Sequence, residues 1–278
     1  MTLVETSVNY FNPPADGSKP YLRAAANVAP VGTHRRNWEP ISYTIQAQNI
    51  RGQEASSEHK LDTTGFEFHR IPNRADINFD DEADIRERYY AECIENIRSI
   101  TGASKVVIFD HTLRKSQSST ISVVDNRSPP VKLVHNNQTN ESAKQHVYLY
   151  IPEPEVPTLL SNRFQILNLW RPIVNPAWQH PLALCDFRTV RPEDHAPFTI
   201  KYLNRDDEAL AFKYNSEHKW KYLAGMTPEE FVLFKCFDSL QDQGTAAFAP
   251  HTAIDDSTVP SDAPDRQSIE IYALVFYG

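Results

Sequence analysis

The chain has 278 residues, a formal net charge of −8 and an isoelectric point near 5.7. An acidic chain without a basic stripe excludes a surface that neutralises nucleic-acid phosphates. No apolar run is long enough to cross a bilayer, and the N-terminus lacks the basic start and apolar core of a secretory signal. We therefore expect a cytoplasmic protein.

The cysteines and the chain length constrain the redox state of the thiols and the number of domains. Cys93, Cys185 and Cys236 are odd in number, widely spaced and set among apolar residues, which favours reduced thiols. Although a chain of 278 residues permits two domains, an all-β barrel with helical additions commonly runs this long. We predict a single domain over residues 1–278.

The chain opens with residues 1–40, which are rich in Pro, Asn and Ala and predict an extended arm. A body of about residues 41–278 follows. Its clearest helix has an apolar residue every four positions over 85–97, and Gly102 ends it. Patterns of strand type predict strands over 42–50, 65–69, 105–109, 131–135, 163–172, 181–186, 209–214, 218–223, 231–237 and 269–276.

Three connections add to this outline. The polar, Pro-terminated stretch 115–130 is typical of a mobile loop that covers a site. Strands 209–214 and 218–223 predict a hairpin, because only three residues separate them. Residues 142–151 fit either a helix or a strand. Short strands after one long helix predict a mainly β fold, a double-stranded β-helix of the jelly-roll or cupin-like type with flanking helices.

Two polar motifs stand at predicted strand ends. His135 and Asn137 share a face, because side chains two apart on a strand point the same way. Further on, His251 precedes Arg266 by 15 residues, and Ser268 follows two later. A buried arginine beside a hydroxyl suits the distal carboxylate of a dicarboxylic acid. The alternative for Arg266 is a surface arginine at a strand start.

Runs of sequence that contain these motifs resemble the fungal gibberellin-desaturase-like family, which is itself similar to the cephem 7α-methoxylase subunit. The runs occur in order over roughly residues 40–278 and are Thr101–Ser104, Val134–Asn137, Asn168–Pro172, Pro181–Asp186, His218–Trp220, Phe237–Ser239, Pro250–Thr252 and Arg266–Glu270. The family contains Fe(II)/2-oxoglutarate-dependent hydroxylases and desaturases of secondary metabolism.

The resemblance implies a set of site residues. His135 and His251 would bind iron together with residue 137, where the family usually has Asp and this chain has Asn137. His218 is the rival second histidine. The residues implied for the cosubstrate or substrate are Arg266, Ser268, Asn168 and Arg171.

The amide of Asn137 keeps three functions open. The first is an oxygenase that uses Fe(II), 2-oxoglutarate and molecular oxygen, with ascorbate as an in-vitro reductant, to hydroxylate, desaturate or oxidatively cyclise a small secondary metabolite. Because an amide is neutral and a poorer ligand than a carboxylate, the second is a non-oxidative isomerisation or cyclisation in the same fold. The third is a non-catalytic ligand-binding or partner subunit. The oligomeric state stays open, a homodimer included.

Overall fold

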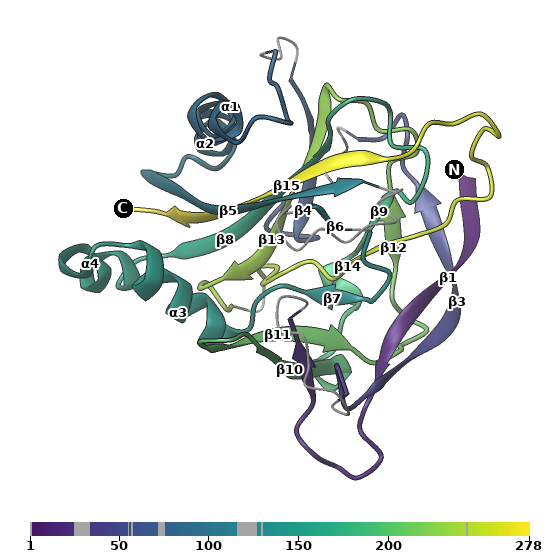
Figure 1. The fold of residues 1–278 in the computed structure, drawn as a ribbon, viewed down its shortest axis with the longest axis horizontal. Coiled ribbons are helices and arrows are strands. Elements are labelled where there is room, and N and C mark those ends of the chain that lie inside the picture. Colours follow the sequence, from purple (N-terminus) through teal and green to yellow (C-terminus); the bar gives the residue numbers. More distant parts are fainter. Residues whose placement is uncertain are drawn as a thin grey trace.

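The computed structural model describes residues 2–24, 34–54, 56, 58–71, 76–115, 127–128, 130–242 and 244–278. Two sheets make up most of it (Figure 1). The nine-stranded sheet has the order β1 (Thr2–Asn12), β3 (Glu39–Asn49), β12 (Trp220–Tyr222), β9 (Leu182–Cys185), β14 (His251–Ala253), β7 (His135–Asn136), β11 (Asp206–Phe212), β10 (His195–Lys201) and β2 (Tyr21–Arg23).

The six-stranded sheet has the order β4 (Phe66–Arg70), β13 (Glu230–Asp238), β8 (Phe164–Pro172), β15 (Gln267–Phe276), β5 (Lys105–Lys115) and β6 (Arg127–Ser128). Its middle strands β13, β8, β15 and β5 are all antiparallel, as are β12, β9, β14 and β7 of the other sheet. Two facing sets of four antiparallel strands are the predicted jelly roll.

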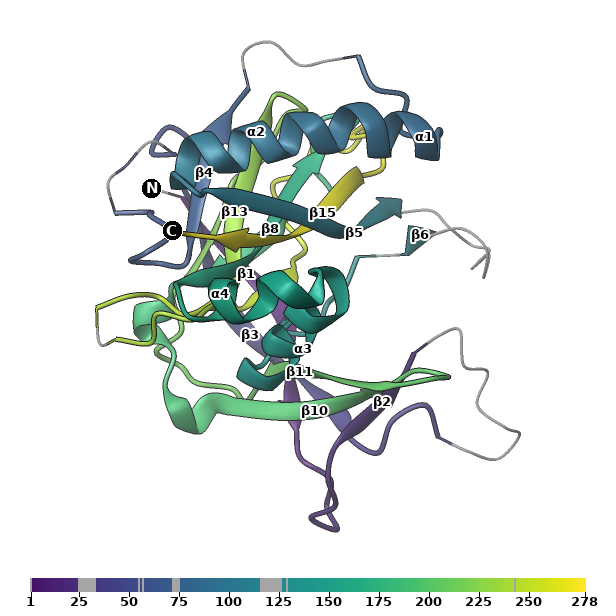
Figure 2. The same cartoon turned by 90° about the vertical axis from the view of Figure 1, so that its left-hand side faces the viewer.

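A long helical segment covers the outer face of the six-stranded sheet (Figure 2). It consists of α1 (Glu82–Asp84), a π-helical stretch (Ile85–Tyr89) and α2 (Tyr90–Thr101). Gly102 ends it with a positive φ of 70°, as predicted, because glycine alone adopts this conformation without strain. The segment that fitted helix or strand is the helix α3 (Asn140–Tyr150), which α4 (Val156–Leu160) follows.

Two predictions about strands differ from the structure. Residues 2–12 are no arm, because β1 pairs with β3 over eleven residues and Asn9 bridges to Leu133. The predicted hairpin is also absent: β11 pairs with β10 and β7, whereas β12 pairs with β3 and β9. The loop 115–130 lies almost entirely outside the described residues, and the single domain over 1–278 stays a prediction.

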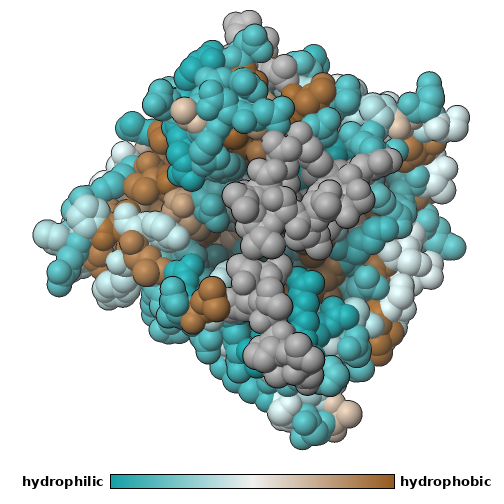
Figure 3. Space-filling view, viewed as in Figure 1, coloured by the Kyte–Doolittle hydropathy of each residue, from teal (hydrophilic) through white to brown (hydrophobic). Residues whose placement is uncertain are grey.

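Apolar side chains also gather on the surface where α3 lies, at the left of Figure 3. Tyr148 and Leu149 are the most exposed of them, at 66% and 54%. Among the residues that the structure describes, no helix is long and apolar enough to cross a membrane.

Candidate active site

Two histidines meet between the sheets. His135 on β7 and His251 on β14 are direct partners in the antiparallel pairing, and such partners project from the same face. Their ring centroids lie 4.4 Å apart, and the ring of Phe234 packs 4.7 Å from that of His251. Two imidazoles that are 116 positions apart in the chain are thus brought together, as the sequence predicted.

Hydrogen bonds set which nitrogen of each ring is available. Nδ1 of His135 lies 2.8 Å from the carbonyl oxygen of Leu133, and Nδ1 of His251 lies 3.0 Å from that of Ala249. A carbonyl oxygen only accepts, so each Nδ1 carries the proton and each Nε2 of a neutral ring keeps its lone pair. Burial lowers the pKa of both rings, that of His251 to about 3 with a further contribution from His135. Both rings are therefore neutral at pH 7 and suited to bind a metal.

Asn137 lies two residues after His135, but its side chain binds a thiol. Its Nδ2 donates a hydrogen bond to Sγ of Cys236, 3.6 Å away on β13. The neighbouring Asn136 is fully buried and donates to the carbonyl oxygens of Gln138 and Cys236, at 2.7 and 2.9 Å, which holds the turn against β13. Over the described part of the chain, no three His, Cys, Asp or Glu side chains gather closely enough to hold a metal ion. A metal here would have two histidines and a neutral amide nearby.

Arg266 is buried close to the histidine pair. It is 2% exposed, its guanidinium lies 5.5 Å from the ring of Trp170, and its Nη1 donates to the carbonyl oxygen of His180. Burial lowers the pKa of Arg266 to about 9, which leaves it charged at neutral pH. Within the described residues, no carboxylate forms an ion pair with it, and its Nε has no partner. A buried cation without a counter-ion is costly unless an anion binds to it.

The strand that follows Arg266 adds further polar groups. The hydroxyl of Ser268 is buried without a partner. Glu270, two residues on, accepts hydrogen bonds from Nε and Nη2 of Arg114 at 2.8 and 3.0 Å and from the hydroxyl of Tyr272 at 2.6 Å. Although burial favours the neutral acid, Arg114 holds the pKa of Glu270 down to about 2.

These groups share one narrow cavity. Both histidines line it together with Arg266, Trp170 and the ion pair of Arg114. Its free volume is about 10 Å³, close to the space of one water molecule. A larger anion therefore enters only when the walls move apart.

Asn168 and Arg171 lie on opposite sides of β8. Asn168 lies two residues before the cavity residue Trp170 and shares its face of β8. It is fully buried, and neither polar atom of its amide has a partner among the described residues. Arg171 instead packs under the helical segment, where it binds Glu92 at 2.7 Å and stacks 4.9 Å from the ring of Tyr89. This placement does not match the expectation that Arg171 lines the barrel interior.

His218, the rival histidine, belongs to a separate buried network. Its Nδ1 accepts from the hydroxyl of Tyr10 at 2.9 Å, and its Nε2 lies 3.1 Å from Oδ2 of Asp194. Trp220 donates to the same tyrosine oxygen at 3.2 Å, so the tyrosine proton points to His218. The network ties β1 to the body, and both ring nitrogens are already engaged, which argues against a metal-binding role for this histidine.

Sequence reasoning missed Arg114 and Glu270. A glutamate on an apolar strand is weak evidence by itself. However, Ser268 and Glu270 lie two apart on β15 and therefore share a face, so the predicted inward role of Ser268 could have identified Glu270 as inward too.

A family model described as an oxidoreductase/YMDC permease-like domain matches residues 8–276. A hydroxylase/desaturase, efuI of Hormonema carpetanum, is 30% identical over 99% of this chain and 95% of its own length. The Fe(II)/2-oxoglutarate-dependent dioxygenase nvfI of Aspergillus novofumigatus is 30% identical over 100% and 98% of the two chains. A solved structure described as the iron and alpha-ketoglutarate-dependent endoperoxidase NvfI superposes with a TM-score of 0.88 at 27% identity, and covers 100% of this chain and 99% of that chain.

Proposed function

We propose that this chain, which belongs to the family of fungal hydroxylase/desaturases and Fe(II)/2-oxoglutarate-dependent dioxygenases, binds iron through His135 and His251. The family makes it an oxidoreductase. The observation that carries the proposal is the pair of neutral imidazoles, each with its Nε2 lone pair left free by a hydrogen bond at Nδ1. The family's small-molecule chemistry with dioxygen then implies hydroxylation, desaturation or oxidative cyclisation of a secondary metabolite.

The cosubstrate site follows from the buried polar groups that have no partner. 2-Oxoglutarate carries two carboxylates, and the unpaired Arg266 with the hydroxyl of Ser268 offers charge and hydrogen bonds to the distal one. Asn168 provides another unpaired amide on the inner face of β8. Trp170 packs against the guanidinium and limits where it can turn. When bound, iron and 2-oxoglutarate would activate dioxygen, which is the oxidant that removes hydrogen from a C–H bond.

The direct test is anaerobic titration with Fe(II) and 2-oxoglutarate. We expect a visible charge-transfer band from the bound pair. Once oxygen is admitted with ascorbate, we expect conversion of 2-oxoglutarate and O2 to succinate and CO2, with the second oxygen atom reduced to water by the ascorbate. His135→Ala is the matched control and should remove both signals. Absence of the band and of succinate in the unmodified chain, with metal binding intact, would contradict the oxygenase function.

A specific observation supports a second candidate function. Asn137 is neutral and donates to Cys236, so no carboxylate of the described residues completes a three-ligand metal site with the two histidines. In this candidate the pocket catalyses an isomerisation or a cyclisation without oxidation. A chain of this kind would bind metal weakly and form no succinate.

Restoring a carboxylate separates the two candidates. We expect Asn137→Asp to tighten Fe(II) or Co(II) binding by roughly ten-fold or more, because a charged oxygen is the better ligand for a hard cation. Asn137→Ala, the control, should change the affinity little if the amide only binds the thiol. Calorimetry under anaerobic conditions measures both, and an aspartate variant with unchanged affinity would show that residue 137 faces away from the metal.

We also place the protein in the cytoplasm. All three cysteines are free and buried, and burial raises the pKa of the Cys236 thiol to about 12. Buried protonated thiols suit a reducing compartment.

A further inference from the structure

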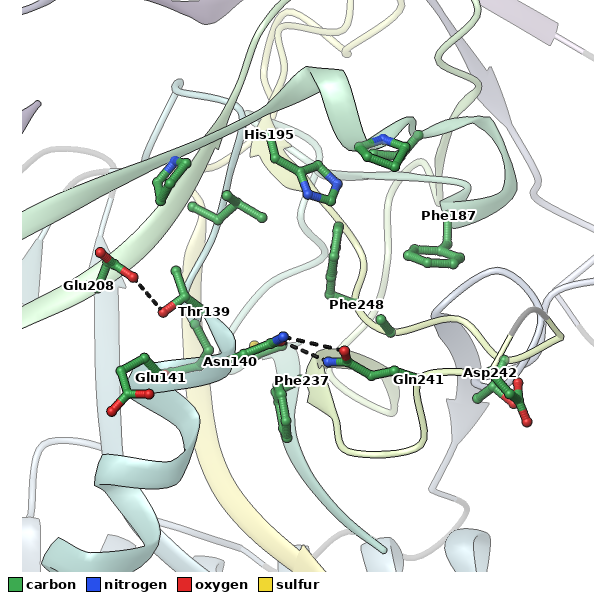
Figure 4. A pocket seen from close by; sticks show the side chains of 18 residues that line it. Thr139, Asn140, Glu141, Phe187, His195, Glu208, Phe237, Gln241, Asp242 and Phe248 are labelled. Carbon is green, nitrogen blue, oxygen red and sulfur yellow. Dashed lines mark hydrogen bonds between the residues drawn. The ribbon is translucent and has the colours of Figure 1, made fainter. Parts of the chain in front are cut away.

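A second, larger pocket lies among the loops at one end of the barrel. The strands β7, β9 and β13 end on this side at Asn136, Cys185 and Asp238, and β14 begins here at His251. The loops after β7, β9 and β13 surround a pocket of about 570 Å³, which we call the mouth pocket (Figure 4). Cys236 lines it and also accepts the hydrogen bond from Asn137, which lies two residues after His135, so one wall of the pocket contacts the segment that carries this candidate metal ligand.

The two ends of the barrel therefore differ in charge. The narrow cavity with Arg266 lies at the end where β15 begins, and the mouth pocket lies at the end where β13 finishes. An anionic cosubstrate and a different second ligand can thus approach the histidines from opposite ends. A volume of about 570 Å³ lies within the range of pockets for small organic molecules.

One wall of the mouth pocket is aromatic. The rings of Phe187 and Phe248 meet edge to face with centroids 5.2 Å apart, and His195 meets Phe248 at 5.4 Å and 67°. Burial lowers the pKa of His195, so this ring is neutral at pH 7 and acts as part of the apolar wall. Leu210 and Val190 extend the same lining. Flat rings of a ligand would stack or pack here at little entropic cost.

The opposite side offers hydrogen bonds without positive charge. Asn140 and Gln241 exchange two amide hydrogen bonds, at 2.8 and 3.3 Å, across the pocket (Figure 4). The charged side chains among the described lining residues are all acids: Glu141, Glu208 and Asp242. Glu208 accepts from the hydroxyl of Thr139 at 2.9 Å, and its other oxygen lies 3.7 Å from the exposed Lys19, outside the lining.

We propose that the mouth pocket is the substrate site and that it selects uncharged, ring-containing molecules with a hydrogen-bonding group over carboxylates, sulfonates and phosphates. That the bound molecule is a substrate rests on the proposed oxygenase function. The selectivity for uncharged molecules does not, because it depends only on the residues that line the pocket. An anion would meet Glu141, Glu208 and Asp242 with no cation in the lining to offset them.

Two fluorescent dyes of the same skeleton test the selectivity. N-phenyl-1-naphthylamine is uncharged, and 8-anilino-1-naphthalenesulfonate carries one sulfonate. We expect fluorescence titration of the full chain to show at least ten-fold tighter binding of the uncharged dye. The triple variant Glu141→Gln, Glu208→Gln, Asp242→Asn should narrow this ratio several-fold by improving binding of the sulfonate. Equal binding of the two dyes by the unmodified chain, or no binding by either, would overturn the proposal.

Site-filling variants establish where the dye binds. Leu210→Trp should abolish binding of the uncharged dye, and Val190→Trp, on a half-buried wall position, gives a second test if the first variant fails to fold. Leu149→Ser is the matched control, because it removes an exposed apolar side chain from the α3 surface and should leave the affinity unchanged. If only Leu149→Ser lost binding, the dye would bind on the α3 surface, and the mouth pocket would not be its binding site.

The outcomes also separate this inference from the oxygenase function. Selective dye binding without a charge-transfer band would leave the pocket standing and refute the oxygenase. A charge-transfer band with no preference between the dyes would support the oxygenase function and refute the proposed selectivity of the pocket. Saturating Co(II) should quench the bound dye in the unmodified chain but not in His251→Ala, because quenching by the metal is short-ranged.

Discussion

Replacing Arg266 by methionine should weaken 2-oxoglutarate binding by at least about 30-fold, because the loss of one partner of a buried charged pair costs about 2–5 kcal/mol. Methionine keeps much of the volume against Trp170 and removes only the charge and the donors. The affinity of the histidine pair for Co(II) should stay unchanged. Calorimetry with 2-oxoglutarate, in the presence of saturating Co(II), measures the effect.

The same substitution should raise the melting temperature of the ligand-free protein. Arg266 is buried without a counter-ion among the described residues, so a neutral side chain removes a desolvated charge. The conservative control is Arg266→Lys, which keeps the charge but loses the planar fork and should recover part of the affinity. If the methionine variant binds 2-oxoglutarate as tightly as the unmodified chain, the cosubstrate is held elsewhere.

His251→Ala should lower the affinity for Fe(II) or Co(II) by roughly 100-fold or more, since even the loss of a group that only orients a ligand costs about 10–100-fold. The substitution removes one of two imidazoles whose rings lie 4.4 Å apart. It should also lower the unfolding free energy, because alanine leaves a void beside Phe234 and removes the hydrogen bond to the buried carbonyl oxygen of Ala249. Metal titration and thermal unfolding together report both effects.

His218→Phe is the matched control for that experiment. It leaves the hydroxyl proton of Tyr10 without its acceptor, which costs about 1–3 kcal/mol for a buried group, and removes one hydrogen bond of Asp194, which keeps those from Arg191 and Asn215. We therefore expect a lower melting temperature with unchanged metal affinity. If His218→Phe abolished metal binding and His251→Ala did not, His218 rather than His251 would be the second metal ligand.

The candidate site was largely predictable because its residues stand at strand ends with a period of two. The pairs His135 with Asn137 and Arg266 with Ser268 each lie two apart, so their common face follows from strand geometry alone. The order of the strands along the chain then brought His251 beside His135. The 116 positions between the two histidines did not prevent this prediction, because the jelly-roll fold pairs β14 with β7.

Other features could not be read in this way. Every residue of β8 is buried, so no polar alternation marks which face carries Arg171, and only the structure places it under the helix. The strands 209–214 and 218–223 look like a hairpin because they are close in sequence, yet their partners come from β3, β7, β9 and β10. Strand patterns predict which faces are buried but do not identify the partner strand.

The pairing of β1 has a consequence for the order in which the protein assembles. Asn9 hydrogen-bonds the backbone of Lys132 and Val134, directly before the candidate metal-binding His135, and Tyr10 meets residues more than 200 positions away. During synthesis the first strand can pair with β3 early, but its contacts with residues 132–134, 218 and 220 wait for most of the polypeptide, which is the kind of long-range closure that slows folding. Until then the segment that carries His135 lacks one neighbour, so competence to take up metal should arise late and together with the docking of the N-terminal strand.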